Sequence, residues 1–225
     1  MLRARHSARR STPAGTQPRA LPTSEPHGFI GVPHGMSGPA AEKVPRKRQP
    51  SISTVLPAAF FDRPADQVAR ELLGKALIRR ICGRDHTLIV TETEAYLGPH
   101  DLACHSARGC TARTETMFGP PGTLYIYLVY GLHWMLNVVT GPEGYAAAVL
   151  VRGAGRLTGP GRLARTLAIS GKLNGRMARP QTGLWFEDRP SPAGRIIATA
   201  RIGVAYAGPV WSRRKLRYIF RMAPR

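Results

Sequence analysis

Residues 119–142 contain no Asp, Glu, Lys or Arg, and this uncharged stretch restricts most strongly how the chain can fold. Its length would allow a membrane-spanning helix. However, Pro120-Pro121-Gly122 and Gly131 interrupt it, and Tyr125 and Tyr127 alternate with aliphatic residues at the period of a β-strand. The stretch therefore predicts buried strands and no membrane span.

The sequence beyond residue 54 predicts more strands than helices. One helix is expected after Phe60, with Asp62 as its cap, Pro64 in its first turn and Gly74 beyond its end. A second helix is expected over residues 160–169. Strands are expected at residues 75–81, 86–94, 124–129, 135–140, 146–152, 183–187, 196–204 and 216–220, with a turn at 83–85 between the first two. Short connections between many strands predict an α+β fold, in which residues 54–225 form a single domain with a curved, largely antiparallel sheet flanked by helices.

Residues 1–53 differ from the rest in composition. The first 50 residues hold 8 of the 20 prolines together with several arginine clusters, and they show no periodic apolar pattern. A disordered, basic, Pro/Arg/Ser-rich extension is therefore expected. Its Arg-rich and acid-poor opening is compatible with an organelle transit peptide, with a non-specific DNA-binding arm, or with translated sequence upstream of the true start.

Charge favours a polyanionic partner. The chain has 33 Lys and Arg against 13 Asp and Glu, a net charge of +20. The first 50 residues contribute nine basic and two acidic residues, so residues 51–225 carry 24 − 11 = +13. Nucleic acid is the first candidate and an anionic membrane surface the second. Three cysteines are too few, and odd in number, for a disulfide framework, and they fit a reducing, intracellular compartment.

The residues suited to chemistry lie mainly between positions 91 and 152. Glu92, Glu94 and Tyr96 share one face of a predicted strand because side chains alternate. A carboxylate at the end of a buried strand is costly unless it is functional or, in the alternative interpretation, paired in a structural salt bridge. Tyr125 and Tyr127 could be ordinary packing residues. Beside a carboxylate and a basic surface, however, aromatic rings also suit a base turned out of a DNA duplex.

A set of motifs occurs in order along this region. They are ETEAYLGP at 92–99, Asp101, His105-Ser106, MFGPPGT at 117–123, YIYLVYG at 125–131 and Asn137, with Phe60-Phe61-Asp62 upstream and residues 201–204 downstream. In order and spacing these motifs resemble the alkyladenine (3-methyladenine) DNA glycosylase family, in its single-domain type, and the resemblance covers roughly residues 55–221.

The resemblance implies how the glycosidic bond is broken. Glu94 matches the general base that takes a proton from the attacking water. Arg152 matches an arginine that helps to hold this water, and the backbone carbonyl of Val204 is expected to do the same. No cofactor and no metal are implied. The closest lysines, Lys75 and Lys172, lie outside the motifs, so a monofunctional enzyme without Schiff-base strand cleavage is expected.

The resemblance also implies how the substrate is held. Tyr96, His105 and Tyr127 match three rings that sandwich the extruded base, which would favour a cationic, alkylated purine. Tyr130 matches an aromatic wedge that fills the gap in the duplex, and Asn137 an amide that clashes with the exocyclic amino group of guanine. The implied partner is double-stranded DNA with alkylated or deaminated purines. The implied state is a monomer that is intracellular and DNA-associated, first in a bacterial cytoplasm or nucleoid, with an organelle or a nucleus as the alternative.

Two positions depart from the family pattern. Thr114 stands where the family usually has Asn, which puts one DNA-side contact in doubt, and Met135 stands where Cys is common. Two other interpretations remain open. Cys104-His105-x₄-Cys110 could begin a metal site, although no further ligand has a convincing spacing. A non-catalytic nucleic-acid-binding module would also use a basic surface, but a carboxylate facing phosphates would oppose binding.

Overall fold

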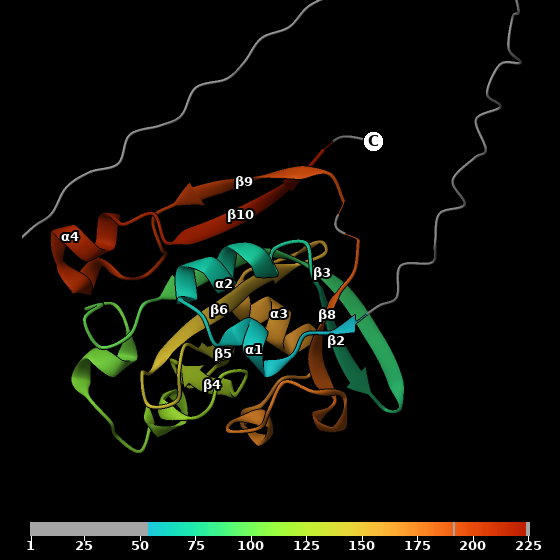
Figure 1. Ribbon diagram of the computed structural model, residues 1–225, viewed down its shortest axis with the longest axis horizontal. Helices are drawn as coiled ribbons and strands as arrows, with labels where there is room; N and C mark the ends of the chain where they lie inside the picture. The colour runs from blue at the N-terminus through green and yellow to red at the C-terminus, as the bar shows by residue number, and fades with distance from the viewer. Residues whose placement is uncertain (1–53, 191, 224–225) are drawn as a thin grey trace, which may run out of the picture. The chain divides into compact units, whose positions relative to one another are not determined.

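The computed structural model describes residues 54–190 and 192–223 (Figure 1). The expected extension over residues 1–53 lies outside this range. The strands are β1 (Thr54–Val55), β2 (Ala76–Ile81), β3 (Arg84–Tyr96), β4 (Leu124–Val129), β5 (His133–Thr140), β6 (Ala147–Ala154), β7 (Leu157–Thr158), β8 (Leu184–Asp188), β9 (Gly194–Thr199) and β10 (Arg217–Met222). The α-helices are α1 (Ala58–Phe61), α2 (Ala65–Leu72), α3 (Pro160–Thr166) and α4 (Gly208–Arg213). Short 3-10 helices are η1 (His105–Arg108), η2 (Glu115–Phe118), η3 (Gly171–Leu173), η4 (Pro180–Thr182) and η5 (Ala205–Ala207).

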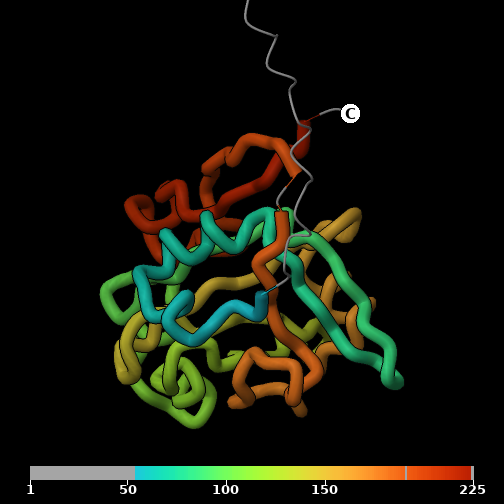
Figure 2. Tube along the Cα trace, turned by 45° about the vertical axis from the view of Figure 1, so that its right-hand side comes forward, coloured from blue at the N-terminus to red at the C-terminus, as the bar shows by residue number. Residues whose placement is uncertain are grey.

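The ten strands form one antiparallel sheet, which confirms the predicted α+β class. Its main order is β1-β8-β2-β3-β6-β5-β4, with β10 beside β3 and β9 beside β10. The long strand β3 changes its neighbours along its length. Its first half pairs with β2, and its second half lies between β6 and β10. Figures 1 and 2 both show the β2–β3 hairpin extending from the body and the orange-to-red β9–β10 hairpin running beside α2.

One face of the sheet carries the hydrophobic core. Helices α2 and α3 pack there with aliphatic residues of the central strands, such as Val149 and Val151 of β6. The hydroxyl of Thr93 in β3 donates to the carbonyl of Ala69 at 2.7 Å and fixes α2 against the sheet. Because side chains alternate along a strand, the residues between these core positions point to the opposite face. That face carries the polar and aromatic residues of the site.

The uncharged stretch forms the hairpin of β4 and β5, as its alternating pattern predicts. Leu124 and Ile126 of β4 join the core beside the helices, whereas Tyr125 belongs to the cluster on the other face. In the described part of the chain, no helix is long and apolar enough to cross a membrane.

Three local predictions are wrong. Asp62 does not cap the helix, because Pro64 disfavours helical backbone at the preceding residue, so the chain breaks between α1 and α2 and Asp62 ends α1. The turn of the β2–β3 hairpin is Cys82-Gly83, both with positive φ, and not residues 83–85. Strand β9 ends at Thr199 and not at residue 204.

Candidate active site

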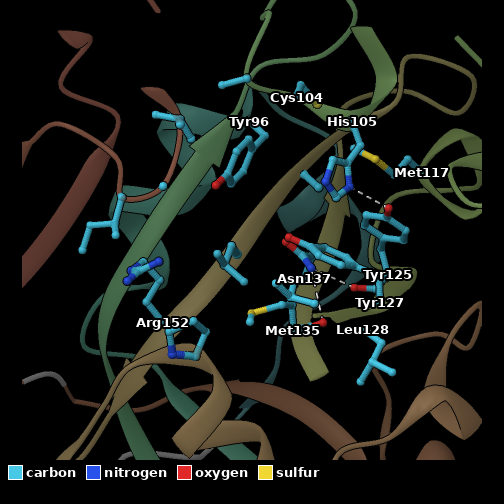
Figure 3. Close-up of a pocket in the computed structure, with 18 of the residues that line it drawn as sticks. Tyr96, Cys104, His105, Met117, Tyr125, Tyr127, Leu128, Met135, Asn137 and Arg152 are labelled. Carbon is cyan, nitrogen blue, oxygen red and sulfur yellow. Dashed lines mark hydrogen bonds between the residues drawn. The ribbon is translucent and has the colours of Figure 1, made fainter. Parts of the chain in front are cut away.

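A cavity of about 540 Å³ opens on the face of the sheet opposite α2 and α3. Its walls come from β3, β4, β5 and β6, from the 103–105 segment and from the loop at residues 202–206. The sequence-predicted residues Tyr96, His105, Tyr127, Tyr130, Asn137, Arg152 and Val204 all line it. Figure 3 shows Tyr96 on one side of this space and His105 with Tyr127 on the other.

Glu94 lies directly behind the cavity wall, with its side chain fully buried. Its Oε2 accepts the hydroxyl of Tyr96 at 2.9 Å, and its Oε1 accepts the backbone N–H of Ile202 at 2.8 Å. The Nε of Arg152 lies 3.4 Å from Oε1. Burial raises the pKa of Glu94, while Arg152, the Ile202 amide and Tyr96 act in the opposite direction. The site thus holds an ionisable carboxylate with raised basicity next to residues of the cavity wall.

Arg152 is held mainly by another carboxylate. Its Nε donates to Oε1 of Glu92 at 2.9 Å, and the same oxygen accepts Nε of Arg217 from β10 at 2.7 Å. The predicted face of β3 is therefore confirmed, because Glu92, Glu94 and Tyr96 are joined by this network. No role was expected from the sequence for Glu92 or for Arg217.

The rings on the far wall are packed against one another. The His105 and Tyr127 centroids are 4.6 Å apart with an interplanar angle of 65°, and those of Tyr125 and Tyr127 are 5.1 Å apart. Nδ1 of His105 lies 2.9 Å from the hydroxyl of Tyr125. Burial, helped by Arg113 and Arg108, lowers the pKa of His105 to about 4. The imidazole is therefore neutral at pH 7.

Tyr130 stands at the exposed rim. It belongs to the tight turn between β4 and β5, which the N–H of Leu132 closes on the carbonyl of Val129 at 3.0 Å. Its backbone has φ 52° and its side chain is 90 % exposed. Positive φ is unfavourable for a bulky residue, and such strain occurs often at functional sites.

Asn137 and Val204 complete the wall. Nδ2 of Asn137, which is buried, donates to the carbonyl of Tyr125 at 3.0 Å. The carbonyl of Val204 accepts the N–H of Ala207 at 3.0 Å, which leaves it one further lone pair. Thr114 is not among the lining residues. Its hydroxyl donates to the carbonyl of Gly109 at 2.8 Å and closes the 109–114 loop.

Comparison with known proteins decides which family has this site. A family model described as Methylpurine-DNA glycosylase (MPG) matches residues 59–158 and 153–224. The chain belongs to this family. It is therefore a DNA glycosylase, an enzyme that hydrolyses N-glycosyl bonds, and it serves base excision repair.

Several relatives of the chain share the name "Putative 3-methyladenine DNA glycosylase". The one from Myxococcus xanthus (strain DK1622) is 46% identical over 163 residues, which cover 68% of this chain and 84% of the relative. The one from Methanocella arvoryzae is 42% identical over 174 residues, covering 68% and 86%. The one from Legionella pneumophila (strain Corby) is 41% identical over 176 residues, covering 75% and 96%.

In this glycosylase a buried ion pair ties together two parts of the wall. Arg201 binds both carboxylate oxygens of Asp101, and its side chain and that of Asp101 are fully buried. Nη1 of Arg201 also donates to the carbonyl of Ala95 at 2.9 Å, and its guanidinium lies 4.8 Å from the ring centre of Tyr96. The next residue, Ile202, donates to Glu94. Strand β9 ends at Thr199 because β10, the strand with which it pairs, begins at Arg217.

Two further features bear on the sequence-based alternatives. Arg113 lies 5.5 Å from the centre of the Tyr127 ring and lines the cavity, although no role was expected for it from the sequence. Cys104 is buried and Cys110 is exposed. Among residues 54–190 and 192–223, no group of three or more His, Cys, Asp or Glu side chains is placed to hold a metal ion.

Proposed function

We propose that this glycosylase turns an alkylated or deaminated purine of the 3-methyladenine type out of duplex DNA and hydrolyses its N-glycosidic bond with water activated by Glu94. The observation that carries the proposal is the environment of Glu94. A fully buried carboxylate has one oxygen bonded to Tyr96, which lines the cavity, and the other bonded to the Ile202 amide. A purely structural ion pair would not need to be placed at this wall.

In the proposed reaction, Glu94 accepts a proton from a water molecule whose oxygen forms a bond with C1′ of the deoxyribose. The bond between C1′ and the purine nitrogen breaks, and its electron pair leaves with the base. An alkylated purine is cationic and departs as a neutral molecule, whereas the neutral base hypoxanthine departs as an anion and takes up a proton from water. Positive charge grows on the sugar as the bond breaks, so the Glu94 carboxylate also stabilises the transition state electrostatically. Arg152 and the Val204 carbonyl would orient the water.

Tyr96 on one side, with His105 and Tyr127 on the other, would sandwich the base. Aromatic faces attract a cationic purine, and the neutral imidazole of His105 does not repel it. Asn137, held by the carbonyl of Tyr125, would exclude guanine by contact with its exocyclic amino group. Tyr130, exposed at the rim, would fill the gap in the duplex and offset part of the unstacking cost.

Among the described residues that line the cavity there is no lysine, which supports base release without strand cleavage. Lys75, one of the two lysines closest in sequence, pairs with Asp188 at 2.7 Å. We also propose that the protein acts as a monomer on double-stranded DNA and that it is intracellular.

A panel of duplex oligonucleotides, each with one lesion, tests the proposal. We expect free base from 3-methyladenine, 7-methylguanine, hypoxanthine or ethenoadenine, and an intact sugar–phosphate backbone at the abasic product. Strand cleavage by the enzyme itself would contradict the monofunctional mechanism. Binding to lesions without release of any base would indicate a binding module instead.

A further inference from the structure

One guanidinium lies between two carboxylates at the floor of the site. Nε of Arg152 is 2.9 Å from Oε1 of Glu92 and 3.4 Å from Oε1 of Glu94. Glu92 is also bound by Arg217, whose Nε is 2.7 Å from the same Oε1. These residues come from three adjacent strands, because β3 carries both glutamates, β6 carries Arg152 and β10 carries Arg217.

The backbone is shaped for this arrangement. Glu92 pairs with Gly153 and Thr93 with Val151, so Arg152 is an extra residue in β6, a β-bulge that redirects its side chain. A Cβ on Gly153 would lie 3.2 Å from Cβ of Glu92 and 3.0 Å from the carbonyl oxygen of Leu157. A side chain at position 153 would therefore force β6 and Glu92 apart by a few tenths of an ångström.

Charged and titratable groups surround Glu94 on every element packed against it. They are Glu92 and Tyr96 on β3, Arg152 on β6, Arg217 on β10, Tyr127 on β4, and Arg201 in the 200–204 loop with its partner Asp101. Solvent screens the interactions of these groups only weakly, since the side chains of Glu92 and Arg152 are 13% and 11% exposed. Arg201 is already neutralised by Asp101. Glu92 and Arg217 therefore decide how much of the charge of Arg152 acts on Glu94.

We propose that Glu92 is a positioning residue of this glycosylase. Together with Arg217 it holds Arg152 back from a tight ion pair with Glu94, which keeps Glu94 basic and leaves Arg152 free to orient the water. The inference rests on the proposed role of Glu94 as general base. An ion pair that merely linked β6, β3 and β10 would affect the stability of the fold but not the basicity of Glu94.

Two charge-removing substitutions should have opposite effects. Glu92→Gln removes a negative charge and releases Arg152 toward Glu94, so the pKa of Glu94 should fall. Arg217→Gln removes a positive charge and leaves Arg152 more firmly bound to Glu92, so the pKa of Glu94 should rise. The amide introduced by Glu92→Gln would still offer an oxygen to both arginines, so the contacts between the strands should persist in this variant.

The experiment is single-turnover release of hypoxanthine from a duplex, measured from about pH 5 to pH 9. For Glu92→Gln we expect the acid limb of the rate profile to move to lower pH by at least about half a unit, with a plateau about tenfold lower. For Arg217→Gln the acid limb should move to higher pH. Glu71→Gln, which removes an exposed partner of Arg63, is the matched control and should leave the profile unchanged.

Unmoved acid limbs in both variants, or shifts in the same direction, would overturn the inference. If one variant fails to fold, as judged by circular dichroism, the direction found with the other decides. Glu94→Gln separates this result from the proposed function. Full activity of that variant would refute Glu94 as the base, whereas an inactive Glu94→Gln with unmoved limbs in the other two variants would refute only the role of Glu92.

Discussion

The phenolic hydroxyl of Tyr96 donates to Oε2 of Glu94 at 2.9 Å. This bond joins a ring on the cavity wall to the buried carboxylate behind it, and it forms because residues 94 and 96 point to the same face of β3. The same geometry leaves Oε1 for the Ile202 amide and Arg152. In the proposed mechanism, base stacking by Tyr96 and water activation by Glu94 would thus take place within one short piece of strand.

Replacing Tyr96 with Phe removes this hydrogen bond and keeps the ring. A hydrogen bond to the charged carboxylate lowers its pKa, so its loss should raise the pKa of Glu94 further and move the acid limb of the pH–rate profile to higher pH. We expect the rate at pH 7 to fall by about three- to tenfold. Tyr218→Phe, in the core, is the control. A Tyr96→Phe profile identical to that of the parent would mean that the bond does not tune Glu94.

His105 should stay neutral well below pH 6, because burial and then Arg113 and Arg108 lower its pKa to about 4. An unfolded chain takes up this proton near pH 6.5, and the folded protein does so only near pH 4. Stability from this residue is therefore present above pH 6.5 and is lost as the pH falls toward 4. NMR titration of the imidazole measures the value directly. Arg113→Ala should raise the pKa of His105 only part of the way toward 6.5, since burial is the larger cause of the shift. A pKa near 6.5 in the parent protein would contradict this prediction.

Tyr130→Gly should separate stability from function. Glycine adopts the positive φ at this position without strain, so we expect the free energy of unfolding to rise by about 1 kcal/mol. Capture of the turned-out base should weaken much more than binding to undamaged duplex, because the wedge is lost. Denaturant unfolding and binding to damaged and undamaged DNA measure the two effects. Tyr130→Ala should weaken capture without the gain in stability, and equal losses on both duplexes would show that Tyr130 is not a wedge.

Asn137→Ala should relax discrimination against guanine. The substitution removes the amide from the wall and leaves the carbonyl of Tyr125 without this donor, at a cost of about 1–3 kcal/mol in stability. The ratio of excision rates for guanine and hypoxanthine is the measurement, and we expect it to rise. Thr140→Val on the same strand is the control, because the buried Thr140 hydroxyl has no hydrogen-bond partner in the described structure. An unchanged ratio would assign the exclusion of guanine to other residues.

The class of the fold could be predicted from the sequence because it depends on local patterns. Alternation in β4 and β5 showed which side chains face the core, and the spacing of Glu92, Glu94 and Tyr96 placed them on one face. The ends of elements were less predictable. Asp62 is a suitable helix cap by type, but Pro64 decides the local backbone.

The supporting residues of the site could not be found in this way, because their partners are distant in the chain. Arg201 binds Asp101 across 100 residues, and Arg217 binds Glu92 across 125. The two residues of each pair lie too far apart in the sequence for their spacing to indicate a contact. The bulge at Arg152 likewise depends on the register of two strands. Gly153 is a local indication of this bulge, but a glycine within a strand can equally mark a bend or the close approach of another backbone.

The most direct test of the central claim is single-turnover base release by Glu94→Gln, measured beside its affinity for the same damaged duplex. Glutamine keeps the shape of the side chain but cannot accept the proton of water at neutral pH. We expect the rate to fall by at least about a hundredfold while the affinity is equal to that of the parent or tighter. Base release at the parental rate would show that the carboxylate behind Tyr96 is not the base that activates water.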